Sequence, residues 1–267
     1  MAVGALAEDH PLIELDKQPS PLRLTTDPAA DLSPAWSPDG RFIAFLRLLS
    51  RDKEEAALLL IPALGGPERK LADVLISEFL PPPYLAWSPD GSWLVISDRG
   101  SHTEPVALFL LSVETGEKRR LTSPPAQFVG DSCPTFSPDG RRLAFSRSGV
   151  GTGDVNLLAL SAGLTPVGDA KRLTFGNRGV AGTAWTADGR EIVFSTGTGR
   201  TSLWRISVLG PGEPQPLVSL GENAFSPAIS RGGRRLSYGH AFFHSTIWRM
   251  AARWSEFEES TEFETPD

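Results

Sequence analysis

Short apolar runs recur down this chain at nearly fixed spacing, and each run fills three consecutive positions. The aligned triplets are Ile43-Ala44-Phe45, Leu94-Val95-Ile96, Leu143-Ala144-Phe145, Ile192-Val193-Phe194 and Leu236-Ser237-Tyr238. A strand with one solvated face would alternate between apolar and polar residues. Consecutive apolar positions instead predict a strand that is covered on both faces, as in sheets that stack against neighbouring sheets.

A turn of one sequence type precedes each triplet. Ser-Pro-Asp-Gly occupies positions 37–40, 88–91 and 137–140, Thr-Ala-Asp-Gly occupies 186–189, and an eroded Ser-Arg-Gly-Gly occupies 230–233. Proline presets φ, aspartate accepts hydrogen bonds from nearby backbone N–H groups, and glycine adopts the left-handed conformation. This chemistry predicts a short hairpin connection between a first and a second strand.

Two further strands complete each repeat. Apolar stretches that predict a third strand lie at 57–61, 107–111, 156–160, 202–206 and 246–249, and polar stretches that predict a fourth strand lie at 69–71, 119–122 and 171–174. The basic side chains of the fourth strand suit an outer edge, because charge discourages pairing between edges. Four antiparallel strands in a repeat of about 45 residues predict an all-β protein, a β-propeller with five recognisable blades.

The ends of the chain leave the number of blades open between five and six. Residues 12–15 and 21–25 predict the last two strands of a partial N-terminal blade, and one of them could complete the last blade. We expect a disordered N-terminus over 1–11, a single propeller domain over 12–251 and a disordered acidic tail over 252–267. Because the repeats start and stop within a blade, the chain is expected to be a fragment or a shortened relative of a longer propeller.

Composition excludes several classes of protein. The net charge of −6 and the pI of about 5.3 argue against a nucleic-acid surface. The single cysteine, Cys133, excludes a disulfide framework and is expected to be a small buried residue of a first strand. No apolar segment reaches the length of a membrane span, and Met1 to His10 lack the basic flank of a secretion signal. We therefore expect a chain that is cytoplasmic as written, or periplasmic if it belongs to an exported or membrane-anchored parent. It is also expected to be a monomer.

The sequence contains no complete catalytic or metal-binding motif. The chain has no Gly-x-Ser-x-Gly elbow, and the glycine-rich run at 197–202 lacks the lysine of a phosphate-binding loop. His240 and His244 flank a predicted hairpin loop without a third ligand, and one aspartate per turn falls short of a calcium site. We predict no catalytic residue, no metal and no cofactor.

One column of polar residues ends the second strands and is the best candidate for a binding site. It contains Arg47, Asp98, Arg147, Thr196 and His240. The loops that follow these strands and the loops between blades should emerge on one face of the disc, opposite the tetrapeptide turns, and function usually resides on such loops. The candidate binding residues are Arg47, Asp98, Arg99, Asp131, Arg147, Asn177, Arg178, Glu222 and His240. The alternative interpretation is that they are solvated loop charges.

The repeats resemble those of TolB-type β-propellers. The residues that carry the resemblance are Pro34 to Gly40 with Phe42 to Phe45, Pro134 to Gly140 with Leu143 to Ser146, and the Arg-Arg-Leu-Thr strand at 119–122. It extends from about Leu12 to Met250. The repeats also resemble propeller segments of bacterial proteins with a winged-helix or kinase domain, and the propeller of prolyl-oligopeptidase-type peptidases, where the disc gates access to a hydrolase domain.

The resemblance implies a non-catalytic scaffold that contacts a protein or peptide, as TolB does in its cell-envelope assembly. TolB also carries an N-terminal α/β domain and an export signal, which this sequence does not show. Three alternatives stay open. The first is an enzyme or small-ligand binder with a site in the central funnel, built from the column of Arg47, Asp98, Arg147 and His240. The second is the propeller of a peptidase of this type, without its catalytic domain. The third is a non-functional remnant of a longer gene.

Overall fold

The computed structural model describes residues 22–196, 201–210, 212–220, 222–230 and 232–240. Blade 1 comprises β1 (Asp31–Trp36), β2 (Phe42–Ser50), β3 (Glu55–Pro62) and β4 (Arg69–Leu75). Blade 2 comprises β5 (Leu85–Trp87), β6 (Trp93–Asp98), β7 (Ala107–Ser112) and β8 (Lys118–Arg120). Blade 3 comprises β9 (Gly130–Phe136), β10 (Arg142–Gly149), β11 (Thr152–Ala159) and β12 (Lys171–Arg172). Blade 4 comprises β13 (Val180–Trp185), β14 (Glu191–Thr196), β15 (Ser202–Ser207) and β16 (Gln215–Pro216), and blade 5 begins with β17 (Ala224–Ile229) and β18 (Leu236–His240).

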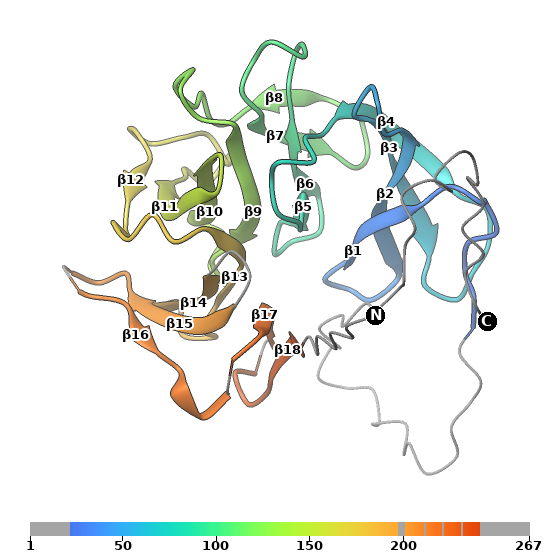
Figure 1. Ribbon diagram of the computed structural model, residues 1–267. Coiled ribbons are helices and arrows are strands. Elements are labelled where there is room, and N and C mark those ends of the chain that lie inside the picture. Colours follow the sequence, from blue (N-terminus) through green and yellow to red (C-terminus); the bar gives the residue numbers. More distant parts are fainter. Residues whose placement is uncertain (1–21, 197–200, 211, 221, 231, 241–267) are drawn as a thin grey trace, which may run out of the picture.

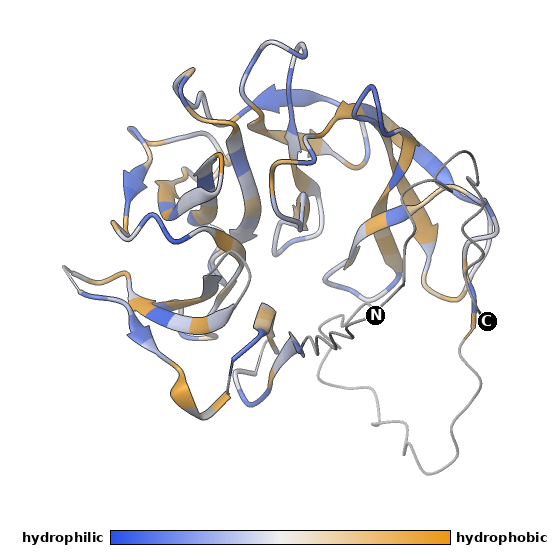
Figure 2. Cartoon of the chain, in the orientation of Figure 1, coloured by the Kyte–Doolittle hydropathy of each residue, from blue (hydrophilic) through white to orange (hydrophobic). Residues whose placement is uncertain are grey.

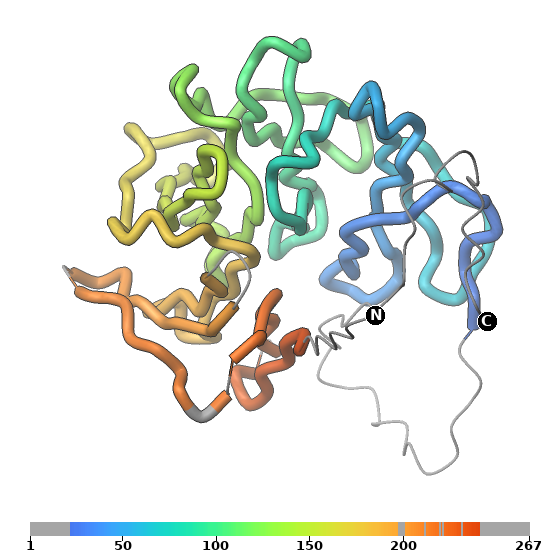
Figure 3. Tube along the Cα trace, in the orientation of Figure 1, coloured from blue at the N-terminus to red at the C-terminus, as the bar shows by residue number. Residues whose placement is uncertain are grey.

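The blades follow one another around a common centre, as a β-propeller requires. Within each blade the strands pair antiparallel in sequence order. The first strands of successive blades contact one another, so these strands lie nearest the axis. The ribbon in Figure 1 and the tube in Figure 3 show the chain passing from blade to blade around an arc, with β4, β8, β12 and β16 toward the rim. The predicted all-β propeller fold is confirmed.

The second strands are buried on both faces in the first four blades. Phe145, Ile96 and Phe194, for example, are each at most 2% exposed. Apolar residues of adjacent blades form shared cores, and the largest lies between blades 1 and 2. Figure 2 shows hydrophobic residues along the middle strands and hydrophilic residues on the outer strands and loops. The predicted triplets are therefore confirmed there, whereas Tyr238 in blade 5 is 37% exposed among the described residues.

The tetrapeptide turns have the predicted chemistry. Gly40 has φ of 71° and its N–H donates to the Ser37 carbonyl over 2.9 Å. The Ser37 hydroxyl donates to the Asp39 carboxylate over 2.6 Å, and the same carboxylate accepts the N–H of Arg41. The turns at 88–91, 137–140 and 186–189 repeat these bonds. Each turn is thus closed locally, which explains how one motif can specify a hairpin in successive blades.

These turn carboxylates predict a loss of stability in acid. The serine hydroxyl bonds lower the pKa of Asp39 and of Asp139 below the ordinary value of 3.8. Because the unfolded chain then takes up protons at a higher pH than the folded chain, this stability is present above pH 3.8 and is lost as the pH falls further. We expect the urea midpoint to fall less between pH 5.5 and pH 3 in an Asp39→Asn/Asp139→Asn variant than in the wild type. If the urea midpoint fell equally in the variant and in the wild type over this pH range, these carboxylates would not be the source of the acid sensitivity.

Backbone and indole bonds join neighbouring blades near the axis. The Trp87 Nε1–H donates to the Ala35 carbonyl, and Trp185 Nε1–H donates to the Thr135 carbonyl, each over 3.0 Å. The innermost strands carry bulges at which non-glycine residues have positive φ, including Ser33 at 51°. Its hydroxyl accepts the N–H of Tyr84, directly before β5 of the next blade, over 3.2 Å. The bulges thus turn side chains across the blade boundary.

Cys133 occupies the equivalent bulge of blade 3. It is fully buried, as predicted, and its N–H donates to the Pro83 carbonyl over 2.9 Å. Its sulfur accepts the N–H of Gly182 over 3.2 Å, and its carbonyl accepts the Thr183 hydroxyl over 2.7 Å. Burial raises the pKa of the thiol to about 12, so it is a packing residue and not a nucleophile.

Two strand predictions need correction or fall outside the described residues. Residues 22–25 were predicted as a strand but have no strand structure. A strand needs a paired edge, and among the described residues no strand pairs with this segment, while Arg23 bonds locally to the Thr25 carbonyl over 2.7 Å. The predicted strands at 12–15 and 246–249, the N-terminal and C-terminal segments and His244 lie outside the described residues.

Helix is almost absent from the part of the chain that the structure describes. The helical element there is the 3-10 helix η1 (Val218–Leu220). None of the described helical structure is long and apolar enough to cross a membrane.

Candidate functional site

The loops after the second strands and the linkers between blades meet on one face, which we name the loop face. Glu54 follows β2, and its carboxylate pairs with Arg99, which follows β6 in the next blade. The Ile76 N–H, in the linker between blades 1 and 2, donates to the Glu54 carbonyl over 2.9 Å. The tetrapeptide turns lie at the other ends of the same strands. The loop face is therefore built from connections that bond to one another.

Arg47 and Arg147 lie in the second halves of β2 and β10 and are held by aspartates of the adjacent first strands. Arg47 Nε donates to Asp31 over 2.8 Å, and a second carboxylate, Glu68, binds the same guanidinium. The bonds from Glu68 and Asp31 raise the pKa of Arg47. Arg147 binds both oxygens of Asp131 over 2.8 Å. Burial raises the pKa of Asp131, and the two bonds from Arg147 oppose that shift.

Asp98, at the end of β6, is 1% exposed and serves the backbone. It accepts the N–H of Leu75 over 2.8 Å and the N–H of Arg99 over 2.7 Å, and it pairs with Lys118 on β8. One carboxylate therefore joins blade 1 to blade 2 and fixes the outer strand. Asp154, on β11 of blade 3, likewise binds its outer strand and the following linker, through Arg172 over 2.6 Å and the Thr174 hydroxyl over 2.8 Å.

The predicted column is thus divided among the blades. Arg47, Asp98 and Arg147 each bind partners near the end of their own second strand, and they do not bind one another. His240, the last residue of β18, is exposed. A funnel site needs the charged groups free to meet a ligand, and these three are instead used in the fold.

The remaining candidates lie on or beside the linkers. Asn177 has φ of 47°, and its side-chain oxygen accepts a bond from Arg172 over 3.1 Å. Glu222 is an exposed residue just before β17. Arg178 is exposed and lies over the ring of Trp204, with the guanidinium carbon 5.0 Å from the ring centroid. Within the described ranges no carboxylate pairs with Arg178, unlike Arg47, Arg99 and Arg147.

A cleft of about 430 Å³ opens beside Arg178, between blades 3 and 4. The linker at 173–180 forms one wall, and blade 4 forms the other with Phe194 of β14 and Trp204 of β15. Trp204 Nε1–H donates to the Ser202 hydroxyl over 2.8 Å, which fixes the orientation of the indole. Phe175 borders the cleft and is 74% exposed. The cleft therefore has a fixed aromatic wall, an exposed aromatic edge and a cation.

Sequence reasoning missed the partners and the aromatic residues of these sites. Asp31 and Glu68 were not among the candidates, yet Asp31–Arg47 and Asp131–Arg147 share a separation of 16 residues that could have shown the pairing. Trp204 was placed correctly in a third strand, but its contact with Arg178 depends on the packing of two blades. No group of three or more His, Cys, Asp and Glu side chains that could hold a metal ion occurs in the residues that the structure describes.

Comparison with known proteins agrees with this architecture. Residues 20–247 match the family described as the TolB beta propeller domain. An uncharacterized peptidase of Bacillus subtilis, YuxL, is 33% identical over 157 residues, which are 46% of this chain and 22% of that protein. The crystal structure of TolB from Acinetobacter baumannii superposes with a TM-score of 0.61 at 20% identity over 82% of this chain and 51% of that one.

A solved peptidase also superposes on this chain, over part of its length. The puromycin-hydrolyzing peptidase of Mycobacterium tuberculosis has a TM-score of 0.53 at 15% identity over 73% of this chain and 30% of that one. This chain spans about a fifth to about half of the length of these three relatives. The family match extends over most of the chain and agrees with the blade repeat described above, so the chain belongs to the TolB β-propeller domain family.

Proposed function

We propose that this domain is a non-catalytic scaffold that binds a protein or peptide segment through the loop face. The observation that supports it most directly is the open cleft between blades 3 and 4, with Phe175 exposed at its edge. Val150, in the β10–β11 turn, and Phe79, in the linker between blades 1 and 2, expose further apolar surface on the same face. Exposed apolar surface that gathers at a cleft and is rimmed by polar residues is typical of protein contact sites.

The charges of the loop face support binding over catalysis. A general acid or base needs a titratable group that can reach a substrate. Asp98 and Asp131 are buried and bonded to Lys118 and Arg147, so their function in the fold is structural. The loop face can therefore bind a ligand through its shape, its apolar surface and a small number of exposed cations.

Panning of a random linear peptide library against the immobilised protein tests this proposal. We expect peptides to be enriched on the wild type and to lose binding to a Val150→Ser/Phe175→Ser variant. The matched control is Leu64→Ser/Val167→Ser, which removes exposed apolar side chains from the opposite face. The control should retain binding. Failure to enrich any peptide, or loss of binding in the control alone, would contradict the proposal.

The identity with the Bacillus peptidase supports a second candidate function. In this case the loop face would cover a hydrolase domain and not an independent partner. The two candidates differ in what binds: a separately expressed hydrolase domain from the same gene, if the gene encodes one, would bind the wild type and not the Phe175 variant.

A further inference from the structure

We infer that the cleft between blades 3 and 4 binds a peptide segment in which a carboxylate lies next to an aromatic side chain. This inference rests on the proposed function and names the chemistry of its ligand. The carboxylate would pair with Arg178, and the aromatic ring would enter the cleft beside Trp204 and Phe194.

In blade 2 the equivalent aromatic ring of the third strand is covered by cations that are paired within the protein. Phe109 on β7 corresponds to Trp204 on β15, because Phe109 pairs with Ile96 and Trp204 pairs with Phe194 in the same register. Lys118 and Arg120 of the outer strand cover the Phe109 ring, at 4.9 and 5.0 Å. Asp98 neutralises Lys118, and Glu104 neutralises Arg120. Both cations over this ring therefore already have carboxylate partners.

Blade 4 differs at each of these points. The outer-strand residue opposite Trp204 is Pro216, where blade 2 has Arg120. The position of Asp98, at the end of the second strand, is Thr196. The cation over the ring comes instead from the linker, as Arg178. Blade 4 thus keeps a cation on an aromatic ring but has lost the carboxylate that would neutralise it.

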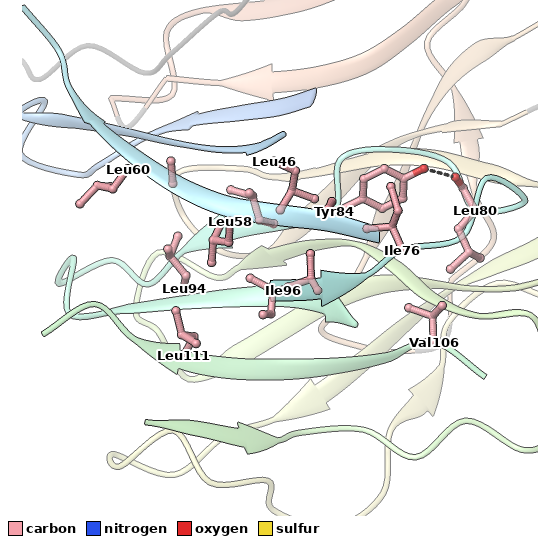
Figure 4. Close-up of a cluster of buried hydrophobic side chains, with 14 residues drawn as sticks. Leu46, Leu58, Leu60, Ile76, Leu80, Tyr84, Leu94, Ile96, Val106 and Leu111 are labelled. Carbon is pink, nitrogen blue, oxygen red and sulfur yellow. Dashed lines mark hydrogen bonds between the residues drawn. The ribbon is translucent and has the colours of Figure 1, made fainter. Parts of the chain in front are cut away.

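The linkers explain why the space beside Trp204 stays open. The linker between blades 1 and 2 fills its boundary with Leu80, which is 2% exposed, and with Tyr84, whose hydroxyl donates to the Leu80 carbonyl over 2.7 Å. Figure 4 shows these two side chains beside Ile76 in the shared core. The linker between blades 3 and 4 has Phe175 and Gly176 in its middle, and Phe175 is exposed. Leu173 and Val180, at the ends of this linker, pack into the core shared by blades 3 and 4, whereas Phe175 in its middle leaves the space beside Trp204 open.

The chemistry of the cleft selects the ligand. A guanidinium stacked on an indole keeps its N–H edges available, and a carboxylate is the group that binds them in a bidentate manner. The cleft volume of about 430 Å³ lies in the range of sites that enclose small ligands. Asp154 and Glu213 also border the cleft; Asp154 is bound by Arg172 over 2.6 Å, and neither carboxylate is paired with Arg178. Both would repel a second acidic group, so a single carboxylate beside a neutral aromatic side chain fits best.

Fluorescence anisotropy with labelled peptides tests this inference. The probes are Gly-Ser-Asp-Phe-Ser-Gly and two matched versions, one with Asn for Asp and one with Ala for Phe. We expect the Asp-Phe peptide to bind about tenfold more tightly than the Asn version, because a charged hydrogen-bonded pair contributes about 1.5 kcal/mol or more. It should also bind about tenfold more tightly than the Ala version, because that version lacks the aromatic side chain that would be buried in the cleft. In an Arg178→Gln variant the Asp-Phe and Asn-Phe peptides should bind with equal affinity.

The control variant is Arg205→Gln. Arg205 is the next residue on β15, so its side chain lies on the other face of the blade, where it bonds to Gln215 over 3.0 Å. This variant has the same change of charge and should keep the preference for Asp-Phe. Absence of binding by the Asp-Phe peptide, or a preference that survives Arg178→Gln, would overturn the inference. If library peptides selected on the loop face bind wild type and Arg178→Gln equally, the inference fails while the proposed function stands.

Discussion

Replacing Gly130 with alanine is expected to destabilise the protein by about 4 kcal/mol or more, the sum of backbone strain and overpacking. Gly130 begins β9 and has φ of 149°, and it bridges to Val106 at the boundary of blades 2 and 3. A Cβ at this position would lie 2.3 Å from the Val106 carbonyl oxygen and 2.6 Å from its nitrogen. Both atoms are backbone, so no side chain can rotate away.

The Val106 backbone is itself fixed on both sides. Its N–H donates to the Val129 carbonyl over 3.0 Å, and its carbonyl accepts the N–H of Asp131 over 2.8 Å. Relief of the clash would break these bonds and displace the residue that holds Arg147. Urea denaturation followed by circular dichroism measures the loss directly.

Two further glycine variants are controls that separate the cost of backbone strain from the cost of overpacking. A Gly116→Ala variant has a positive φ of 73° and open space around the new Cβ, so it should show the backbone cost alone, about 1 kcal/mol. Gly163→Ala has open space and an ordinary φ and should be neutral or slightly stabilising. If Gly130→Ala lost no more stability than Gly116→Ala, the close contact of Gly130 with Val106 between blades 2 and 3 would be contradicted.

The sequence predicted the elements whose causes are local. The tetrapeptide turns are closed by bonds within five residues, as between Ser37, Asp39 and Phe42. The buried triplets follow from their lack of alternation, and Ile43, Leu94 and Leu143 are all buried as expected. These features depend on few long-range contacts, so one repeat is enough to recognise them.

Features that depend on packing between segments were not predictable in the same way. Whether residues 22–25 form a strand depends on an available edge, and the apolar pattern of the segment does not report one. Likewise, Arg178 is one loop charge among several in the sequence, and only the packing of the blades places it over Trp204. Asp98, Thr196 and His240 end their strands as predicted, whereas β2 and β10 continue beyond Arg47 and Arg147. The bonds of these two arginines to Asp31 and Asp131 cross between strands.

The second large effect is expected at the ion pair of Asp131 and Arg147. Asp131→Asn should destabilise the protein by about 3–5 kcal/mol, the usual cost of leaving one member of a buried pair alone. The Asp131 side chain is 0% exposed and the Arg147 side chain 17% exposed, and Asp131 supplies the carboxylate for this guanidinium. The free energy of unfolding from urea titration measures the loss.

Asp31→Asn provides the matched comparison, because the same pair in blade 1 has reserve partners. Arg47 also binds Glu68, and Asp27 lies 3.7 Å away, so its charge stays compensated when Asp31 is neutralised. We expect a loss of about 1 kcal/mol there, typical of one hydrogen bond in a network that survives. Equal losses at Asp31 and Asp131 would show that the partners of Arg47 do not substitute for one another.

An apolar replacement distinguishes the two explanations for a loss at Asp131. If the cost arises from the unpaired guanidinium, then Asp131→Leu/Arg147→Met should recover most of the stability that Asp131→Asn loses, since buried ion pairs are often replaceable by apolar residues of similar size. If the double variant is as unstable as the single one, the pair contributes net attraction to the fold. The second result would also bear on the loop face, because a column of charges that is needed for stability is not available for a funnel site.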